Sequence, residues 1–126
     1  MAMLHAELTD QVLGGFYVVY KDLGFGFLEP VYTNALAVEL QFRGLEVQRE
    51  VPSEVVYRGV VVGRYRADLT VNGRPLIEVK ATKTMTDADE RQLLNYLKAT
   101  DVELGLLLHF GPKPAFRRLI HTNDRK

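Results

Sequence analysis

The chain of 126 residues contains no cysteine, which excludes disulfide frameworks and thiolate metal sites. It also lacks long hydrophobic runs. The longest, Leu104–Leu108, includes a glycine and is far shorter than the roughly 18 residues of a membrane-spanning helix. Met1–Glu7 has neither the charged nor the apolar region of a secretory signal. We therefore expect a cytoplasmic protein that does not enter the membrane.

Net charge is also absent, because 16 basic residues balance 16 acidic ones. Domains dedicated to nucleic acids are often strongly basic, so this balance argues against tight nonspecific binding of DNA or RNA. The charge is unevenly distributed, however: Arg58–Lys83 holds six basic and two acidic residues, a formal charge of +4. Such a segment suits contact with a phosphate backbone. The alternative is an ordinary solvated surface.

The length and the ordinary composition, 47% hydrophobic and 25% charged, fit one globular domain over residues 1–126. Apolar residues at helical spacing predict helices at Thr9–Leu23 and Pro30–Phe42, and Thr86 begins a third helix. Strands are predicted at Val47–Val56, Val60–Tyr65, Ala67–Val71, Pro75–Val79, Leu104–Phe110 and Phe116–His121, followed by a frayed tail at Asn123–Lys126. A strand, a helix and a near-continuous apolar strand in succession indicate a βαβ unit, so Pro75–Lys80 and Leu104–Phe110 are expected to be parallel. The fold class is therefore α/β.

Local signals refine the first two helices. Thr9 is expected to cap the first helix, and Gly24 to end it. Gly14 and Gly15 weaken the interior of this helix, which indicates close packing against another helix. In the second helix, one apolar stripe is formed by Val31, Ala35, Val38 and Phe42.

Charged side chains interrupt an aliphatic strand at Glu78 and Lys80. Residues two apart on a strand point to the same face, so these two share a face while Val79 packs on the other. Ionised groups are rarely buried unless they are paired or bind a metal. Together with Asp68 they supply two carboxylates and an ammonium group, which suit Mg²⁺ (or Mn²⁺) and phosphate, and the carbonyl of Val79 offers a further oxygen. Lys80 could then hold or deprotonate an attacking water, or neutralise phosphate charge.

The turn between the two strands tests this hypothesis. A two-residue turn would place Asp68 and Glu78 on opposite faces of the sheet. A metal site therefore predicts a three-residue loop, Asn72–Arg74, or a bulge; alternatively, Asp68 lies where the strands splay. A simpler interpretation needs no metal: the two acids form a cross-strand ion pair with Arg66 and Lys80.

A further set of residues carries a family resemblance. The segment Gly26–Tyr32 has the form Gly-x-x-Glu-x-x-Tyr. The later parts follow in order as Ala35–Leu40 (Ala-Leu-x-x-Glu-Leu), Arg66–Asp68 (Arg-x-Asp), Glu78–Lys80 (Glu-x-Lys), Gln92–Tyr96 (Gln-x-x-x-Tyr) and Gly105–Phe110 (Gly-Leu-Leu-Leu-x-Phe). Over about Glu7–Ile120, the chain resembles the GxxExxY protein family, a branch of the PD-(D/E)xK nuclease superfamily.

This resemblance implies a restriction-endonuclease-like core, in which helices flank a central mixed β-sheet. It implies that Asp68 and Glu78 bind the metal and that Glu29, from the first helical region, lies near it. It also implies that Lys80 is the superfamily's catalytic lysine and that Gln92 faces the site from its helix.

Some of these residues also have simpler explanations. Gln92 shares a helix face with Tyr96, four residues later, and is otherwise an ordinary solvated residue. Glu29 suits an N-cap or a first-turn acid favoured by the helix dipole. Tyr32 is expected to be a core aromatic with a satisfied hydroxyl group, and His109 a hydrogen-bonded core histidine.

We therefore expect a Mg²⁺-dependent or Mn²⁺-dependent phosphodiesterase that cleaves DNA or RNA. The alternatives are a nuclease-fold module without turnover, which binds nucleic acid or a protein partner, and a structural domain with an accidental charge cluster. Crowded carboxylates repel phosphate unless a cation is present, which favours catalysis. Sequence specificity would require a homodimer, a protein partner or a loop that the sequence does not identify.

Overall fold

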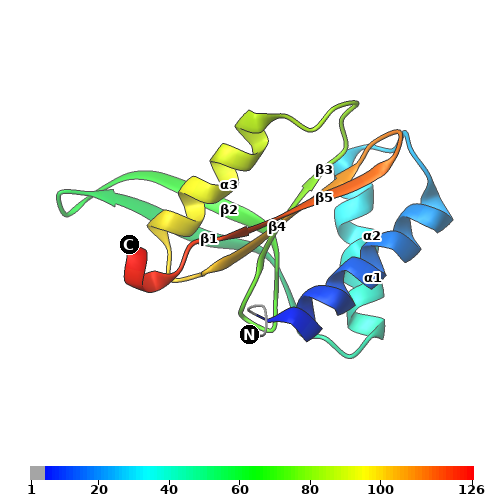
Figure 1. Ribbon diagram of the computed structural model, residues 1–126, viewed down its shortest axis with the longest axis horizontal. Coiled ribbons are helices and arrows are strands. Elements are labelled where there is room, and N and C mark those ends of the chain that lie inside the picture. The colour runs from blue at the N-terminus through cyan, green and yellow to red at the C-terminus, as the bar shows by residue number, and fades with distance from the viewer. Residues whose placement is uncertain (1–4) are drawn as a thin grey trace.

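The computed structural model describes residues 5–126 of the chain. Residues 1–4 lie outside the described residues, and with them part of Met1–Glu7, where no secretory signal is expected. The elements follow as α1 (Ala6–Leu23), α2 (Glu29–Phe42), β1 (Val47–Tyr57), β2 (Val60–Val71), β3 (Leu76–Lys80), α3 (Asp87–Ala99), β4 (Leu104–Phe110), β5 (Pro114–Ile120) and the 3₁₀ turn η1 (Asn123–Arg125) (Figure 1). Among the described residues, no helix is long and apolar enough to cross a membrane.

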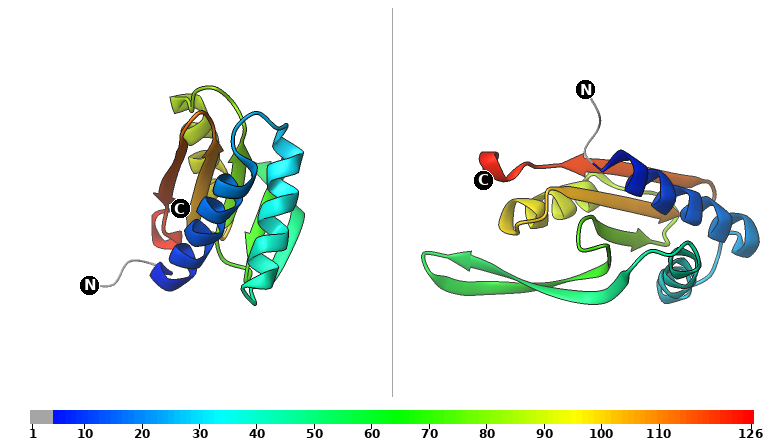
Figure 2. Two further views of the ribbon diagram at one scale, coloured as in Figure 1. Left: turned by 90° about the vertical axis from the view of Figure 1, so that its right-hand side faces the viewer. Right: turned by 90° about the horizontal axis from the view of Figure 1, so that it is seen from below.

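Five strands form one sheet in the order β1-β2-β3-β4-β5. Neighbouring strands are antiparallel except β3 and β4, which are parallel and are joined through α3. The helices α1 and α2 pack against one face of the sheet and α3 against the other (Figure 2). The prediction of an α/β fold with a central mixed sheet flanked by helices is confirmed, as is the parallel βαβ unit.

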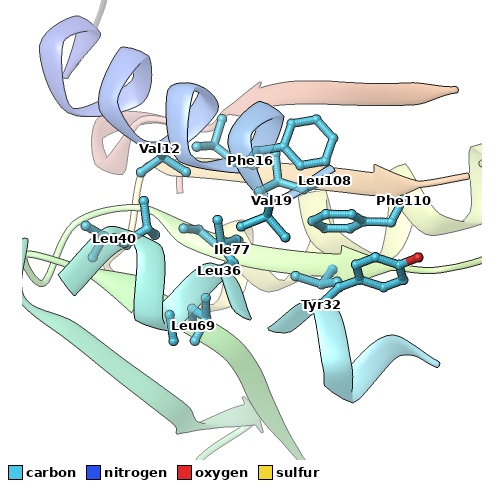
Figure 3. Close-up of a cluster of buried hydrophobic side chains, with 14 residues drawn as sticks. Val12, Phe16, Val19, Tyr32, Leu36, Leu40, Leu69, Ile77, Leu108 and Phe110 are labelled. Carbon is cyan, nitrogen blue, oxygen red and sulfur yellow. The ribbon is translucent and has the colours of Figure 1, made fainter. Parts of the chain in front are cut away.

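The larger hydrophobic core lies between the sheet and the helices α1 and α2 (Figure 3). Phe16 of α1 and Leu40 of α2 are fully buried there. The ring of Phe110, at the end of β4, stacks on Tyr32 with centroids 4.2 Å apart and meets Phe16 edge-on at 4.9 Å. Burying one such side chain stabilises the fold by about 1.5–3 kcal/mol. The cluster therefore fixes the start of α2 firmly against the end of β4.

The glycine pair in α1 has the predicted role. A Cβ atom on Gly15 would lie 2.8 Å from Leu40 Cδ2, and one on Gly14 would lie 2.9 Å from an Arg43 guanidinium nitrogen. Both glycines therefore let α1 approach α2 closely, which is why their helix-weakening effect is tolerated. Gly24 ends α1 as predicted, with a φ of 70° and its N–H donating to the carbonyl of Tyr20 at 2.8 Å.

The predicted cap of α1 is wrong. The helix begins at Ala6, three residues before Thr9, and its N-cap position is His5 with a φ of 51°. Thr9 is instead a buried residue inside the helix. The helix starts before Thr9 because Leu8 packs on the core, so burial extends the helix beyond the polar residue.

Three of the four residues in the apolar stripe predicted for α2 lie on its solvent side, and the fourth, Ala35, packs against the core. Val38 is 48% exposed and Phe42 is 85% exposed. The buried face consists of Tyr32, Leu36, Ala37 and Leu40. This helix has apolar residues all around it, so spacing alone fits two faces. The packing of Tyr32 on Phe110 selects which face is buried.

The strands β1 and β2 form one long hairpin that extends past the rest of the sheet (Figure 2). The two strands are joined by a turn at Arg58 and Gly59, with φ angles of 51° and 79°. The expected break in β2 at Arg66 is wrong, because Arg66 continues the ladder opposite Pro52. An exposed arginine on one face of a strand interrupts the apolar alternation without interrupting the strand.

The expected frayed tail is also wrong. Residues Asn123–Arg125 form the turn η1. The ammonium group of Lys126 donates to the carbonyls of Thr100 and Val102, at 2.6 and 2.7 Å. A cation at the C-terminal end of a helix satisfies its last carbonyl groups, so the end of the chain is attached just beyond α3.

Candidate active site

Asp68 and Glu78 are neighbours because the loop between their strands has three residues. Leu69 pairs with Ile77 and Thr70 with Leu76, which leaves Asn72–Arg74 as the loop beyond the next pair. The same register sets Asp68 opposite Glu78. The predicted three-residue loop is therefore confirmed. Regular pairing also stops at Leu69 and Ile77, so the alternative that Asp68 lies where the strands splay holds as well.

Side chains replace the ladder hydrogen bonds where β2 and β3 separate. The N–H of Val79 donates to Asp68 Oδ2 at 2.8 Å. The N–H of Asp68 donates to Glu78 Oε1 at 3.4 Å. Each carboxylate thus accepts a backbone N–H from the opposite strand, which satisfies donors that the splay would otherwise leave open. The two acids are consequently held in place by the backbone of the sheet.

A kink in the hairpin explains why Asp68 turns toward β3. Ala67 belongs to the smaller core cluster with α3, whereas Leu69 belongs to the larger cluster with α1 and α2. Residues two apart on a regular strand share a face, so β2 rotates at Asp68. Opposite this point in β1, Glu50 has a φ of 51°, an unusual backbone conformation for a residue with a side chain.

Burial and mutual repulsion act on the acids of the site. Burial first, and then the charge of Asp68, raise the pKa of Glu78 from 4.5 to about 7, while Lys80 and the hydrogen bonds to Glu78 oppose this rise. Burial also raises the pKa of Asp68, against the hydrogen bond from Val79 and the charge of Lys80. Neither acid forms an ion pair with Arg66 or Lys80. The simple cross-strand ion pair is therefore wrong: Lys80 lies near enough to act by its charge, without direct pairing.

The site also contains two tyrosines that the sequence analysis did not assign to it. The hydroxyl group of Tyr65 donates to Glu78 Oε1. The ring of Tyr65 stacks on that of Tyr96 from α3, with centroids 3.4 Å apart and planes within 9°. Burial and the nearby charge of Glu78 raise the pKa of Tyr65, so it remains a donor. The available signal was the position of Tyr65 on the strand of Asp68, and of Tyr96 on the helix face of Gln92.

Glu29 is the first residue of α2, and Leu28 is the N-cap. The first-turn role is therefore confirmed and the N-cap role is wrong. Burial and the charges of Asp68 and Asp89 raise the pKa of Glu29, whereas Lys80 lowers it. Glu29 therefore lies within electrostatic reach of the site. Within residues 5–126, however, no three or more His, Cys, Asp or Glu side chains form a group that could hold a metal ion.

Tyr32 fixes the loop that precedes Glu29. It is fully buried, its hydroxyl group donates to the carbonyl of Gly24 at 2.5 Å, and it accepts the N–H of Phe27 at 3.1 Å. The prediction of a core aromatic with a satisfied hydroxyl group is confirmed. Gly26 in the same loop has a φ of 118°, which other residues rarely adopt. The Gly-x-x-Glu-x-x-Tyr segment thus places an acid at a helix start through a pinned loop.

Tyr32→Phe is expected to lower the free energy of unfolding by about 1–2 kcal/mol, because a buried hydroxyl group with two partners is lost. Urea unfolding measures this change. Tyr17→Phe is the matched control, since Tyr17 is 43% exposed on α1. Equal stability of the two variants would show that the hydroxyl group of Tyr32 does not hold the loop.

Two further residues singled out in the sequence, Gln92 and His109, form no hydrogen bond with Asp68 or Glu78 among the described residues. Gln92 is exposed on α3. His109 is only 4% exposed, and its Nε2 lies 3.0 Å from the hydroxyl group of Thr82. The prediction of a hydrogen-bonded core histidine is confirmed.

The donor set suits a hard divalent cation. Hydrogen bonds engage one oxygen of each carboxylate, Asp68 Oδ2 and Glu78 Oε1. The second oxygen of each acid accepts none from the described residues. Mg²⁺ is commonly held by one or two carboxylates together with waters and phosphate oxygens, so two acids are sufficient. Raised carboxylate pKa values mark a place where a cation would relieve repulsion.

Comparison with known proteins places this geometry in a family. The crystal structure of SSO0001 is similar to this chain, with a TM-score of 0.57 and 22% sequence identity over 95% of this chain and 61% of that chain. This likeness concerns the fold alone, and the chain spans less than two thirds of that protein's length. No curated protein matches the chain. The family model for the PD-(D/E)XK nuclease superfamily matches residues 6–119. The chain therefore belongs to the PD-(D/E)XK nuclease superfamily.

Proposed function

We propose that this protein is a nuclease that hydrolyses phosphodiester bonds in DNA or RNA with the aid of Mg²⁺ or Mn²⁺. The observation that carries the proposal is the pairing of Asp68 with Glu78 at the splay of β2 and β3, where each keeps one oxygen for another partner. Lys80 follows Glu78 on the same strand face. Among the described residues, neither acid forms an ion pair with Lys80, so ion pairing does not explain why these charges gather on one surface.

Asp68 and Glu78 would hold the cation, with Glu29 as a further acid at the start of α2. The backbone of Val79 supports a third protein ligand: its N–H faces Asp68, and the N–H and C=O groups of one strand residue point to the same neighbouring strand. A bound divalent cation would supply a Lewis acid that withdraws charge from phosphate and acidifies water. The ammonium group of Lys80 would hold the attacking water or neutralise phosphate charge.

The substrate side of the proposal rests on charge. The segment Arg58–Lys83 has a formal charge of +4 and includes both strands of the site. Its exposed arginines Arg64 and Arg66 lie on β2, where they can approach phosphate groups. Gln92 on α3 would contact the nucleic acid beside the acids. We further infer that residues 1–126 act as one nuclease domain of the GxxExxY branch. The hydrogen bonds of Tyr32 hold the loop before Glu29, which gives the Gly-x-x-Glu-x-x-Tyr motif a structural role.

A second candidate is a nuclease-fold module that binds nucleic acid or a protein partner without turnover. One observation favours it: within the described residues, Glu29, Asp68 and Glu78 do not form a joint group able to hold a metal ion. A site with two acids that binds a cation weakly would fit this role. The two candidates differ in whether the cation promotes cleavage.

Metal binding is tested by thermal unfolding with and without Mg²⁺ or Mn²⁺. A cation at 100 times its Kd stabilises the folded state by about 2.7 kcal/mol, so the wild type is expected to gain several degrees in Tm. Asp68→Asn should lose most of this gain. Asp101→Asn, an exposed acid beyond α3, is the matched control and should keep it. Equal gains in all three proteins would show that the cation binds elsewhere.

A further inference from the structure

The side chain of Tyr65 occupies an oxygen of a proposed metal ligand. Its hydroxyl group donates to Glu78 Oε1, the same atom that the N–H of Asp68 approaches at 3.4 Å. Of these two donors the backbone N–H is the more distant, so Tyr65 is the main partner of Oε1. The oxygen Oε2 is the one that remains for a cation.

The ring of Tyr65 has a fixed position. It stacks face to face on Tyr96, with centroids 3.4 Å apart and an angle of 9° between planes. Tyr96 belongs to α3, whose buried Leu93 and Leu97 attach the helix to the sheet. The chain of contacts from α3 through Tyr96 to Tyr65 therefore holds the hydroxyl group against Glu78. Because Oε1 also accepts the N–H of Asp68, both of its lone pairs are engaged, and presenting Oε1 to a cation would break one of these hydrogen bonds.

Asp68 is restrained in the same way, because Val79 donates its N–H to Oδ2 at 2.8 Å. Oδ2 accepts this one hydrogen bond and keeps a second lone pair, whereas Glu78 Oε1 has two donors and leaves Oε2 as the free oxygen. Mg²⁺ is small, requires near-octahedral geometry and retains several waters. It therefore needs only a few protein ligands, each of which can contribute one oxygen. Ca²⁺ takes six to eight oxygens and gains from carboxylates that bind through both oxygens. A site in which Glu78 is restricted to one oxygen therefore disfavours Ca²⁺.

We propose that Tyr65 is a positioning residue that makes this site select Mg²⁺ over Ca²⁺, by holding one oxygen of Glu78 away from the cation. The inference rests on the proposed metal-dependent function. It adds the residue that determines which cation the site prefers. Tyr65 does not touch the cation or the substrate; it acts through Glu78. Among the described groups that hydrogen-bond to the two acids, Tyr65 is the only side chain, so it can be changed without altering the backbone.

The test is isothermal titration calorimetry of wild-type protein and Tyr65→Phe with Mg²⁺ alone and with Ca²⁺ alone. The phenylalanine ring keeps the stack on Tyr96 and removes only the hydroxyl group. Partners that orient metal ligands change metal affinity by about 10–100-fold. We therefore expect the ratio of Mg²⁺ affinity to Ca²⁺ affinity to fall about tenfold or more in Tyr65→Phe. Tyr17→Phe, an exposed tyrosine on α1, should leave the ratio unchanged.

A general loss of structure would weaken the binding of both cations alike and would not change the ratio of their affinities. Binding of both cations with the same ratio in wild type and Tyr65→Phe would overturn the proposal and leave the proposed function intact. Wild type that binds neither cation would overturn both. Tyr96→Leu provides a second variant, because it removes the stack and keeps the hydroxyl group. The ratio of Mg²⁺ affinity to Ca²⁺ affinity is expected to fall in this variant too. An unchanged ratio in both variants contradicts the role of the tyrosine pair.

Discussion

Glu78→Gln is expected to abolish metal-dependent cleavage and, in the metal-free protein, to raise the free energy of unfolding above neutral pH. The ionised carboxylate is unfavourable in the folded protein, because burial and Asp68 raise the pKa of Glu78 from 4.5 to about 7. Glutamine keeps the shape of the side chain and can still accept the hydrogen bond from Tyr65. The variant therefore loses a proposed metal ligand and a destabilising charge in one change.

The sign of the pH dependence follows from linkage. The folded protein holds the Glu78 proton more tightly than the unfolded chain does, so stability falls as pH rises from about 4.5 through about 7. The full difference is about 3 kcal/mol, at 1.36 kcal/mol for each pKa unit. Asp68 and Glu29 also have raised pKa values and act in the same direction. Glu78→Gln should therefore reduce the slope without removing it.

Urea unfolding of metal-free protein at about pH 5 and about pH 8 measures this effect. Wild type should lose stability between the two pH values, and Glu78→Gln should lose less. Glu7→Gln, an exposed acid in the first turn of α1, serves as the control and should behave as the wild type does. A parallel loss in wild type and Glu78→Gln would contradict the raised pKa. Added Mg²⁺ should stabilise the wild type at the higher pH and have little effect on the variant.

Lys80→Ala is expected to lower the cleavage rate by about 10²–10⁴-fold, the range for a group that assists proton transfer. Because Lys80 is not a proposed metal ligand, the gain in Tm from Mg²⁺ should persist. The lysine lies one strand residue beyond Val79 and lowers the pKa values of Glu29, Asp68 and Glu78, so its charge reaches the whole site.

Lys83→Ala is the matched control for this change. Lys83 is an exposed lysine in the loop that follows β3, and its removal should affect cleavage only modestly. A Lys80→Ala protein that cleaves at the wild-type rate would remove Lys80 from the mechanism. A protein that also loses its stabilisation by Mg²⁺ would indicate that Lys80 supports the acids rather than the reaction.

The parts of the fold that the sequence predicts are those with local causes. Thr86 and Asp89 form the capping box of α3 within four residues of each other, and the near-continuous apolar run of β4 is buried throughout. The three-residue loop Asn72–Arg74 was predictable for another reason: the two acids reach one face only with that register. Chemistry at the site thus constrained the pairing of strands.

The parts that the sequence does not predict depend on distant contacts. Tyr65 and Tyr96 lie in β2 and α3, and nothing near either residue in the sequence indicates the other. The kink at Asp68 faces Glu50, whose φ of 51° has no glycine or asparagine to signal it. The sequence does not decide which face of α2 is buried, because the helix carries apolar residues on more than one face. In each case the tertiary packing, rather than the local pattern, decides the outcome.

The central claim is tested most directly by the cleavage of a mixed panel of labelled DNA and RNA with Mg²⁺ or Mn²⁺. Wild type, Lys80→Ala and Glu78→Gln are compared under the same conditions. The proposal predicts metal-dependent cleavage by wild type that is lost or strongly reduced in both variants, and the panel then identifies the substrate class. Wild-type protein that binds the metal and cleaves none of the substrates would contradict the nuclease assignment and favour a binding module.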